Sequence, residues 1–158
     1  MKEIVSEYMA DFLNRRKQGQ GITFWGSVGA GKSHLAACVL KEACIYCGAY
    51  WATEDAIFDT FKANCSDPGE EIEYLKTLQR RPLLVIDDMG VRKPSDYVID
   101  RYEAIINARW ESSLPTVITT NRTPEQLSEI YERQMSRLSS NIDVQVLGPD
   151  GRRAMAQG

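Results

Sequence analysis

A glycine-rich loop between an apolar run and a helical pattern constrains the fold of this chain more than any other feature. The apolar run at 22–25 is followed by Gly26, Gly31, Lys32 and Ser33, which satisfy the pattern G-x-x-x-x-G-K-[ST]. The match lies directly after a predicted strand and directly before a predicted helix, the context that a phosphate-binding loop requires. A flexible loop with an exposed lysine does not account for that context. The segment therefore predicts an α/β fold that holds phosphate.

Each residue type in the loop has a physical reason to be there. Glycines let consecutive backbone N–H groups point inward, and the start of the following helix adds the positive end of its dipole. Lys32 then reaches the β- and γ-phosphates, and the hydroxyl of Ser33 binds the Mg²⁺ ion that bridges them. The residues expected to surround the phosphates are Gly26, Ser27, Val28, Gly29, Ala30, Gly31, Lys32, Ser33 and His34. The ring of His34 is expected to pack or to face solvent rather than to catalyse.

Apolar runs alternate with helical periodicity along the chain, which is typical of a parallel sheet covered by helices. Short apolar runs predict strands at 22–25, 49–53, 83–87, 116–120 and 143–147. Helices are predicted at 31–47, 54–64, 70–79, 95–111 and 124–139. The opening segment 3–17 has one apolar helical face, and RRKQGQG behind it is typical of a linker.

Polar side chains follow two of the predicted strands. Asp87 and Asp88 end the run LLVIDD, and Asn121 ends TVITTN. In a parallel sheet these ends lie at one edge, where ligands bind in open α/β folds. Asp87 is expected to hold the metal, Asp88 to orient the attacking water, and Asn121 to hold that water or the γ-phosphate. The structural alternatives are a solvated turn for the two acids and a turn-capping role for the amide.

The bulk composition limits the classes of function. At 158 residues the chain is the size of one domain, and its net charge of −3 excludes a surface that is basic throughout. A nucleic-acid site must therefore be local. No apolar stretch is long enough to span a membrane, and the acidic start does not resemble a signal peptide. We therefore expect a cytoplasmic protein with no membrane partner.

The four cysteines do not indicate a zinc site or a redox site. CIYC at 44–47 has no second pair of ligands at similar spacing, which a zinc site would need. A thioredoxin-like motif would open a helix after a strand, whereas CIYC ends a predicted helix. We therefore expect small buried thiols in a reducing compartment.

Four segments together resemble the AAA+ ATPases, and within them the group of the helicase loaders DnaC and DnaI and the transposition helper IstB. They are GSVGAGKSHLA, LLVIDDMGVRKPSDY, NARWESSLPTVITTN and ERQMSRLSS, in that order, within residues 20–148. The resemblance implies that the first two are Walker A and Walker B, and that TVITTN is sensor 1. It implies a P-loop NTPase of the AAA+/ASCE type, with a five-stranded parallel sheet sandwiched by helices, that binds ATP or ADP with Mg²⁺.

The resemblance also implies residue roles. Asn121 becomes the sensor, Arg137 in SRL becomes an arginine finger offered to the nucleotide of a neighbouring subunit, and Arg133 becomes a second contact. A finger in trans would cancel charge on the transferring phosphoryl group, so self-association would be part of the activity. Because Arg133 and Arg137 are four residues apart, a solvated basic helix face is the structural alternative.

Two features depart from that family. Its Walker B segment usually ends in Asp-Glu, whereas the second acid here is Asp88, so we expect hydrolysis to be slow or to need assembly. Little room follows the fifth predicted strand for the helical lid that most AAA+ proteins carry. The expected division is an N-terminal helix and linker at 1–20, the ATPase domain at 21–148 and a flexible tail at 149–158.

A DNA site is expected in the insert between the second predicted strand and the Walker B strand, because that insert helps the loaders to hold single-stranded DNA. Here it carries more acidic than basic residues, so it is a poor isolated DNA surface. Subunits assembled in a spiral would line a pore with Lys62, Arg92, Lys93 and Arg101, and Phe61 would stack on bases. A solvated face is the alternative for each of them.

The leading hypothesis is the ATPase motor of a helicase loader, which assembles with single-stranded DNA or with a replicative helicase. An IstB-like transposition helper is the alternative within the same family. A small-molecule P-loop kinase would need an arginine-rich lid over its acceptor, and none is visible. A further alternative is an adapter that binds ATP without hydrolysing it and uses ATP to set its assembly state. Slow hydrolysis at Asp88 would be consistent with such an adapter.

Overall fold

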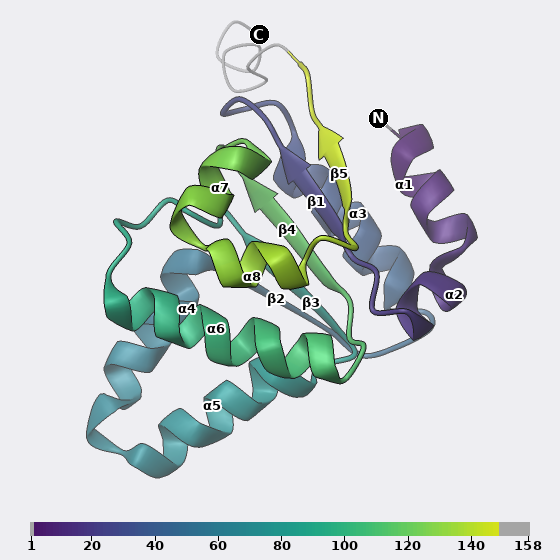
Figure 1. The fold of residues 1–158 in the computed structure, drawn as a ribbon. Coiled ribbons are helices and arrows are strands. Elements are labelled where there is room, and N and C mark those ends of the chain that lie inside the picture. Colours follow the sequence, from purple (N-terminus) through teal and green to yellow (C-terminus); the bar gives the residue numbers. More distant parts are fainter. Residues whose placement is uncertain (1, 149–158) are drawn as a thin grey trace, which may run out of the picture.

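Five parallel strands in one sheet form the centre of the molecule, in the spatial order β2-β3-β4-β1-β5 (Figure 1). The computed structural model describes residues 2–148. The strands are β1 (Ile22–Trp25), β2 (Ala49–Thr53), β3 (Leu83–Asp87), β4 (Thr116–Thr120) and β5 (Ile142–Gln145). All five predicted strands are confirmed. The last of them is shifted, because its pairing with β1 starts at Ile142.

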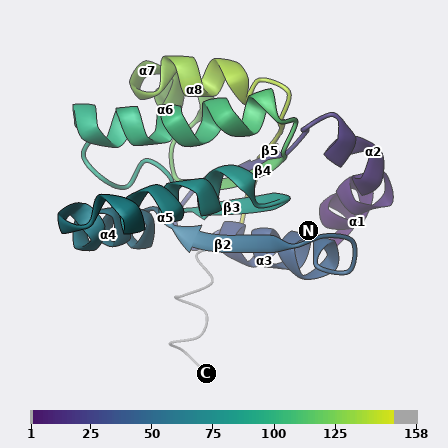
Figure 2. The same cartoon turned by 90° about the horizontal axis from the view of Figure 1, so that it is seen from below.

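Helices cover both faces of the sheet, which confirms the predicted sandwich (Figure 2). One face carries α1 (Lys2–Ala10), α2 (Phe12–Lys17) and α3 (Lys32–Ala43). The other face carries α4 (Glu54–Ala63), α5 (Pro68–Arg80), α6 (Asp96–Glu111), α7 (Pro124–Ile130) and α8 (Glu132–Arg137), with the short 3₁₀ helix η1 (Asn64–Ser66) between α4 and α5. Within residues 2–148 no helix is long and apolar enough to cross a membrane, and no helical lid follows β5.

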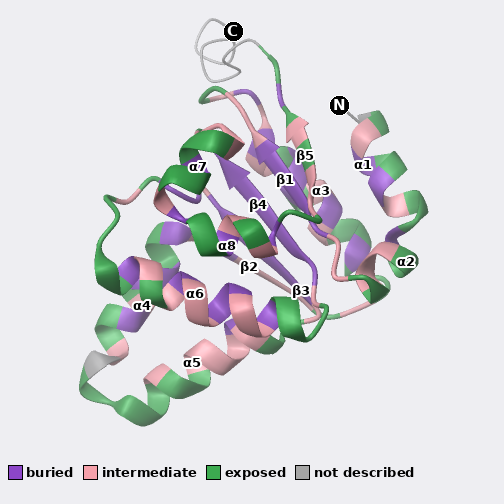
Figure 3. Ribbon diagram, viewed as in Figure 1, coloured by how far each residue is buried: buried purple, intermediate pink, exposed green. Residues whose placement is uncertain are grey.

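The two central strands, β3 and β4, are buried along their whole length (Figure 3). Successive side chains of β3 point to opposite faces of the sheet and pack in two different hydrophobic cores. Leu83 and Val85 pack with α3. Leu84 and Ile86 pack with the layer of helices α4–α8. This alternation follows from the two-residue period of a strand. It explains why the strands are continuous apolar runs rather than alternating ones.

The strand order decides where the functional side chains meet. β4 pairs with β3 on one side and with β1 on the other, and every pair is parallel. The carboxyl ends of β1, β3 and β4 therefore lie next to one another at one edge of the sheet. The predicted phosphate loop, the two acids and the sensor amide all follow these three ends.

The N-terminal segment forms two helices instead of the single helix predicted at 3–17. The chain leaves helical geometry at Asp11, where φ is −116°, and the Asp11 carbonyl accepts the N–H groups of Asn14 and Arg15 to start α2. The break lets Phe12 enter the core beside Tyr8 and α3. The predicted linker RRKQGQG is therefore wrong in its first half, because residues 15–17 belong to α2.

Several other helix boundaries differ from those predicted from the sequence. α5 begins at Pro68, two residues before the predicted start at 70, because the Asp67 carboxylate caps it by accepting the N–H of Gly69 at 2.9 Å. The helix predicted at 124–139 starts with a capping box between Thr123 and Gln126 and is interrupted at Tyr131, whose φ is −122°. The Tyr131 ring is buried edge-on against Tyr102 of α6, and this packing determines where the helix bends.

The expectation of buried thiols is wrong in part. α3 ends at Ala43, so CIYC lies in the turn that follows the helix, and Cys44 is exposed. Cys38 and Cys47 are half-buried, and all three thiols are free. The predicted tail at 149–158 lies outside the described residues.

A buried cation, Arg109 of α6, holds the end of the sheet opposite to the phosphate loop. Its guanidinium donates to the carbonyl oxygens of Leu78, Arg81 and Pro115 at 2.6–2.9 Å and to the Thr116 hydroxyl at 2.9 Å. Burial lowers the pKa of Arg109 to about 9, which leaves the side chain cationic at pH 7. Two of the acceptors lie at the C-terminal end of α5, where the helix dipole favours positive charge.

Replacing this cation should destabilise the whole domain. Arg109→Met leaves buried carbonyl groups without their donors, so we expect the free energy of unfolding to fall by about 2–4 kcal/mol. Urea denaturation at pH 7 measures the change. Lys76→Gln on α5, which breaks an exposed ion pair with Glu73, is the control and should cost less than about 1 kcal/mol. Equal stability of Arg109→Met and the original chain would contradict the role given to Arg109.

Candidate nucleotide site

The loop between β1 and α3 needs glycine at its two ends. Gly31, the N-cap of α3, has a φ of 98°, in the left-handed region that other residues rarely adopt. At Gly26 φ is 143°, and a Cβ atom would lie 2.5 Å from the carbonyl oxygen of Val146. The loop thus leads directly into a helix of 12 residues, whose first N–H groups and dipole favour an anion.

Lys32 is a buried cation that joins the loop to the end of β4. Its side chain lies in the first turn of α3 and is only 5% exposed. The Nζ atom donates to the carbonyl oxygens of Gly26 and Ser27, at 3.0 and 2.7 Å, and to Oδ1 of Asn121 at 2.7 Å. The structure therefore brings together the predicted phosphate lysine and the predicted sensor.

Asp87 ends β3 with its carboxylate buried beside β4. Its Oδ1 atom accepts the hydroxyl proton of Thr119 at 2.5 Å. The same hydroxyl accepts the N–H of Asp88 at 2.9 Å. Asp88 has a φ of 58°, so the chain turns sharply away from the sheet directly after the first acid. Asp is one of the few residues that adopt this left-handed conformation readily.

The turn that follows the two acids is tied to β4 as well. The Thr120 hydroxyl donates to the carbonyl oxygen of Met89 at 2.8 Å, and Nε of Arg122 donates to the carbonyl oxygen of Gly90 at 2.8 Å. The N–H of Met89 also reaches the carbonyl oxygen of Thr119 at 2.9 Å. The ends of β3 and β4 therefore form one hydrogen-bonded unit.

Ser33 and Asp87 supply the kind of oxygen atoms that Mg²⁺ prefers. Ser33 lies next to Lys32 in the first turn of α3, and Asp87 is the last residue of β3, which β4 separates from β1. Among the described residues no three His, Cys, Asp or Glu side chains gather to bind a metal by themselves. Because Mg²⁺ commonly takes one or two protein ligands together with phosphate oxygens, this pair fits a metal that arrives with a nucleotide.

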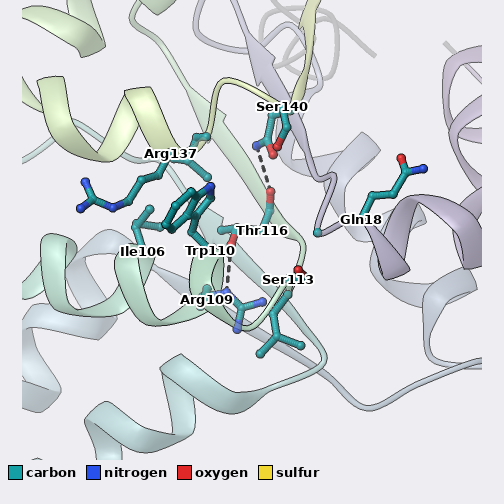
Figure 4. A pocket seen from close by; sticks show the side chains of 12 residues that line it. Gln18, Ile106, Arg109, Trp110, Ser113, Thr116, Arg137 and Ser140 are labelled. Atoms are coloured by element: carbon teal, nitrogen blue, oxygen red, sulfur yellow. Dashed lines mark hydrogen bonds between the residues drawn. The ribbon is translucent and has the colours of Figure 1, made fainter.

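The two predicted arginines lie away from this edge. Nε of Arg137, at the end of α8, donates to Oδ1 of Asn107 at 2.6 Å, and its guanidinium lies over the Trp110 ring (Figure 4). Arg133 pairs with Glu103 at 3.2 Å. Asn107 and Trp110 belong to α6, and the Arg137 guanidinium also donates to the carbonyl oxygen of Arg133 at 3.1 Å, so none of these contacts involves the phosphate loop. The structure therefore does not bring the arginines together with Lys32 in the same chain.

The residues predicted to meet DNA are separated in the structure. Lys62, Arg92 and Lys93 line a groove of about 490 Å³ between α4 and the start of α6. Arg92 is bound to Asp55 and Asp59, at 2.7 and 2.5 Å, which neutralises its charge.

The remaining two members of that set lie against α5. Arg101 is paired with Glu71, and its guanidinium also covers the ring of Phe61. Phe61 is 0% exposed, so the prediction that it stacks on bases is wrong. It fills the core between α4 and α5 instead, whereas Tyr97 at the groove is 44% exposed.

Sequence reasoning missed two residues that organise the site. Thr119 lies within a predicted strand, and no motif marks its contact with the acids. Glu54 lies almost completely buried at the start of α4, where it accepts the Arg92 N–H at 2.8 Å and the Tyr102 hydroxyl at 3.2 Å. A glutamate in a first helical turn is usually an exposed partner of the dipole, so nothing in its position predicted this burial.

Comparisons with known proteins agree with this geometry. A family model described as IstB-like ATP binding protein matches residues 3–143. The replicative helicase loader DnaC of Escherichia coli is 33% identical over 121 residues, which are 73% of this chain and 48% of DnaC. The crystal structure of the DnaC helicase loader aligns with a TM-score of 0.80 at 28% identity, over 91% of this chain and 86% of that chain.

A more distant structure shares the fold. The replication initiator DnaA, bound to AMPPCP and single-stranded DNA, has a TM-score of 0.78 at 22% identity, over 93% of this chain and 45% of that chain. This chain spans less than half the length of the curated relatives that it matches. Because the family model covers most of the chain and the sheet has the AAA+ order, the chain belongs to the IstB-like ATP-binding proteins of the AAA+ P-loop class, homologous to the DnaC helicase loaders.

Proposed function

We propose that this chain is the ATP-hydrolysing motor of a replicative-helicase loader, which assembles with single-stranded DNA, with a helicase, or with both. The observation that carries the proposal is the division of the site between two places. Lys32, Asn121 and Asp87 meet at the carboxyl edge of the sheet, whereas Arg137 is held on α6. An arginine so placed suits the nucleotide of a neighbouring subunit, as an arginine finger in trans requires.

Each side chain at the edge has one task in the proposed reaction. Lys32 binds the β- and γ-phosphates of ATP, and Ser33 and Asp87 hold Mg²⁺. The metal supplies positive charge that stabilises the transferring phosphoryl group. Asp88 orients the attacking water, and Asn121 holds that water or the γ-phosphate. The products are ADP and inorganic phosphate.

Binding of ATP requires Lys32 to exchange partners. Its ammonium group now donates to the carbonyl oxygens of Gly26 and Ser27 and to Oδ1 of Asn121, and these three acceptors are neutral. Phosphate oxygens are charged acceptors and form stronger hydrogen bonds. The exchange would release Asn121 from Lys32, so the sensor becomes available when the γ-phosphate arrives. Nucleotide binding is thereby coupled to the end of β4.

Hydrolysis is expected to be slow in the isolated chain. Asp88 is one methylene shorter than the glutamate usual in the family, so its carboxylate reaches less far from the backbone. Its left-handed φ of 58° suits aspartate better than glutamate. A neighbouring subunit that adds Arg137 would stabilise the transition state and raise the rate.

The groove beside α4 supports a contact with single-stranded DNA. Lys62 and Lys93 are exposed on it, and Tyr97 offers an aromatic ring at the same place. Positive charge with aromatic rings is the usual means of binding single strands. Because Arg92 is paired with acids, the basic side chains that line the groove and can meet DNA are Lys62 and Lys93, a small positive charge for one chain. Binding is therefore expected to need several assembled subunits in the cytoplasm.

A transposition helper of the IstB type is the second candidate, and the match to the IstB-like family favours it. The same motor would then serve a transposase instead of a helicase. A small-molecule kinase and a non-hydrolysing adapter use the same phosphate loop. The kinase would move phosphate to an organic acceptor, whereas the adapter would bind ATP without releasing phosphate.

The most informative experiment measures phosphate release while the size of the protein is followed in solution. We expect slow release from ATP and Mg²⁺ alone, and a rise of at least tenfold when single-stranded DNA drives assembly. Light scattering measures the size, and a coupled phosphate assay measures the rate. Double-stranded DNA of the same length is the control for charge.

The other candidates give different outcomes in the same experiment. Phosphate recovered on an added nucleoside or other small acceptor indicates a kinase. Assembly with ATP but no phosphate release indicates an adapter. An ATPase that responds to a helicase or a transposase, but not to DNA, identifies the protein partner as the activator.

Lys32→Ala should weaken ATP binding. The variant loses charged hydrogen bonds to the phosphates, so we expect the dissociation constant to rise by about tenfold to a hundredfold or more. Equilibrium binding of a fluorescent ATP analogue measures it. Lys41→Ala, an exposed lysine in the last turn of the same helix, is the matched control and should bind normally. Normal binding by Lys32→Ala would exclude the loop as the phosphate site.

Arg137→Ala should bind ATP normally but lose the assembly-stimulated hydrolysis, by about a thousandfold for a finger in trans. Mixing Arg137→Ala with Lys32→Ala subunits provides the decisive assay, because the second variant still supplies its own Arg137 to the intact nucleotide site of the first. We expect the mixture to regain activity. Arg80→Ala, an exposed arginine at the end of α5, is the control. Weaker ATP binding by Arg137→Ala, without recovery on mixing, would show a structural arginine instead.

A further inference from the structure

Thr119, in the interior of β4, contacts both acids that follow β3. It is 0% exposed and lies two residues before Asn121. Its hydroxyl donates to Oδ1 of Asp87 at 2.5 Å and accepts the N–H of Asp88 at 2.9 Å. A threonine hydroxyl has one proton to donate. That proton is committed to the carboxylate at the site proposed for the metal.

The hydrogen bond from Thr119 limits how the Asp87 carboxylate can turn. A carboxylate at the end of a strand has a broad, nearly two-fold rotation about its last side-chain bond. A short bond from a buried, χ1-restricted threonine to one oxygen holds that oxygen against β4. The orientation of the other oxygen, Oδ2, is then determined as well, because the two oxygens share one plane.

The bond to Asp88 fixes the backbone at the point where it leaves the sheet. The regular pairing of β3 with β4 ends with Ile86 opposite Ile118. Beyond this pair the Asp88 N–H turns to a side chain, the Thr119 hydroxyl. Asp88 adopts a left-handed φ of 58°, a conformation that aspartate tolerates better than most residues, and this bond helps to hold the turn.

The next residue, Thr120, offers a natural comparison. It is also 0% exposed and also donates a hydroxyl hydrogen bond to the turn after β3. Its acceptor is the carbonyl oxygen of Met89 at 2.8 Å, and it accepts the N–H of Arg122 at 3.1 Å. Thr120 therefore supports the backbone of the turn without touching either acid.

We propose that Thr119 is a positioning residue that orients the Asp87 carboxylate toward the metal of the bound nucleotide. The proposal rests on the proposed function, since it assumes that ATP and Mg²⁺ bind at this edge. Thr119 touches neither the nucleotide nor the metal and acts through Asp87. Outer hydrogen bonds of this kind contribute about tenfold to a hundredfold to metal affinity in other sites.

The test compares nucleotide binding with and without the metal, so it does not depend on hydrolysis. The probe is AMPPCP, titrated by calorimetry in Mg²⁺ or in EDTA, and the readout is the ratio of the two dissociation constants. We call the dissociation constant in EDTA divided by that in Mg²⁺ the Mg²⁺ enhancement. Thr119→Val keeps the shape of the side chain but removes the hydroxyl, and we expect it to lower the Mg²⁺ enhancement by about tenfold or more. Its affinity in EDTA should stay within about twofold of the original chain, because Lys32 and the loop are unchanged.

Two variants separate positioning from structure. Thr119→Ser restores the hydroxyl and should restore the Mg²⁺ enhancement. Thr120→Val removes an equally buried hydroxyl from the same strand and should keep the enhancement. If thermal unfolding shows that Thr119→Val does not fold, Thr119→Ala replaces it, because the smaller side chain cannot clash with β3.

The outcomes distinguish this proposal from the proposed function. Undiminished Mg²⁺ enhancement in Thr119→Val or its substitute, or an equal loss in Thr120→Val, would overturn the role of Thr119 alone. An original chain that binds AMPPCP equally in Mg²⁺ and EDTA would overturn the metal assignment of Asp87 and the role of Thr119 with it. An original chain that binds no AMPPCP would overturn the proposed function as a whole.

Discussion

The position of β4 between β1 and β3 is the constraint on which the rest of the site depends. Because all three strands are parallel, their carboxyl ends share one edge, although the residues that follow them are far apart in sequence. Lys32 and Asn121 are separated by 89 positions, yet their side chains are 2.7 Å apart. A parallel sheet needs long crossovers, and each crossover here supplies a helix that buries one face.

The same strand order gives β4 two different contacts within a few residues. At its end Asn121 meets Lys32 of the phosphate loop, and just before it Thr119 meets Asp87 and Asp88. Both contacts belong to the end of one strand, and all five residues of that strand are buried. A shift of Asn121 would therefore also move Thr119. Close-packed interiors resist small displacements, so the two halves of the site must adjust together. This gives a physical basis for the sensor role proposed for Asn121.

Much of the fold and the centre of the site could be predicted from local sequence. The strands are uninterrupted apolar runs with turn residues after them, and the loop before Lys32 has a pattern whose glycines are required by its geometry. Asp87, Asp88 and Asn121 were predicted as site residues because they end or follow strands, and parallel strands place such residues at one edge. These predictions depend only on short-range pattern and on one rule of topology.

The features that could not be predicted arise from packing between distant elements. Nothing in the sequence near Asp11 or Tyr131 indicates a helix break. Each break allows an aromatic ring, Phe12 or Tyr131, to be buried against another helix. Phe61 lies in a segment rich in charge, yet the α4–α5 pair needs it as core. Thr119 carries a hydroxyl like its neighbours in TVITT, and only the register with β3 decides which hydroxyl reaches an acid.

Arg137 lies away from the nucleotide site of its own chain. An arginine finger in its own active site would hold a permanent positive charge near ATP, and a single chain could then hydrolyse ATP without a partner. Here the guanidinium is held by Asn107 and Trp110 of α6, on the same layer that carries the groove beside α4. If that layer also meets DNA or a neighbour, as proposed, assembly and completion of the site become one event. Rapid ATP consumption is then limited to the assembled state, and this restriction makes ATP a timing signal as well as a fuel.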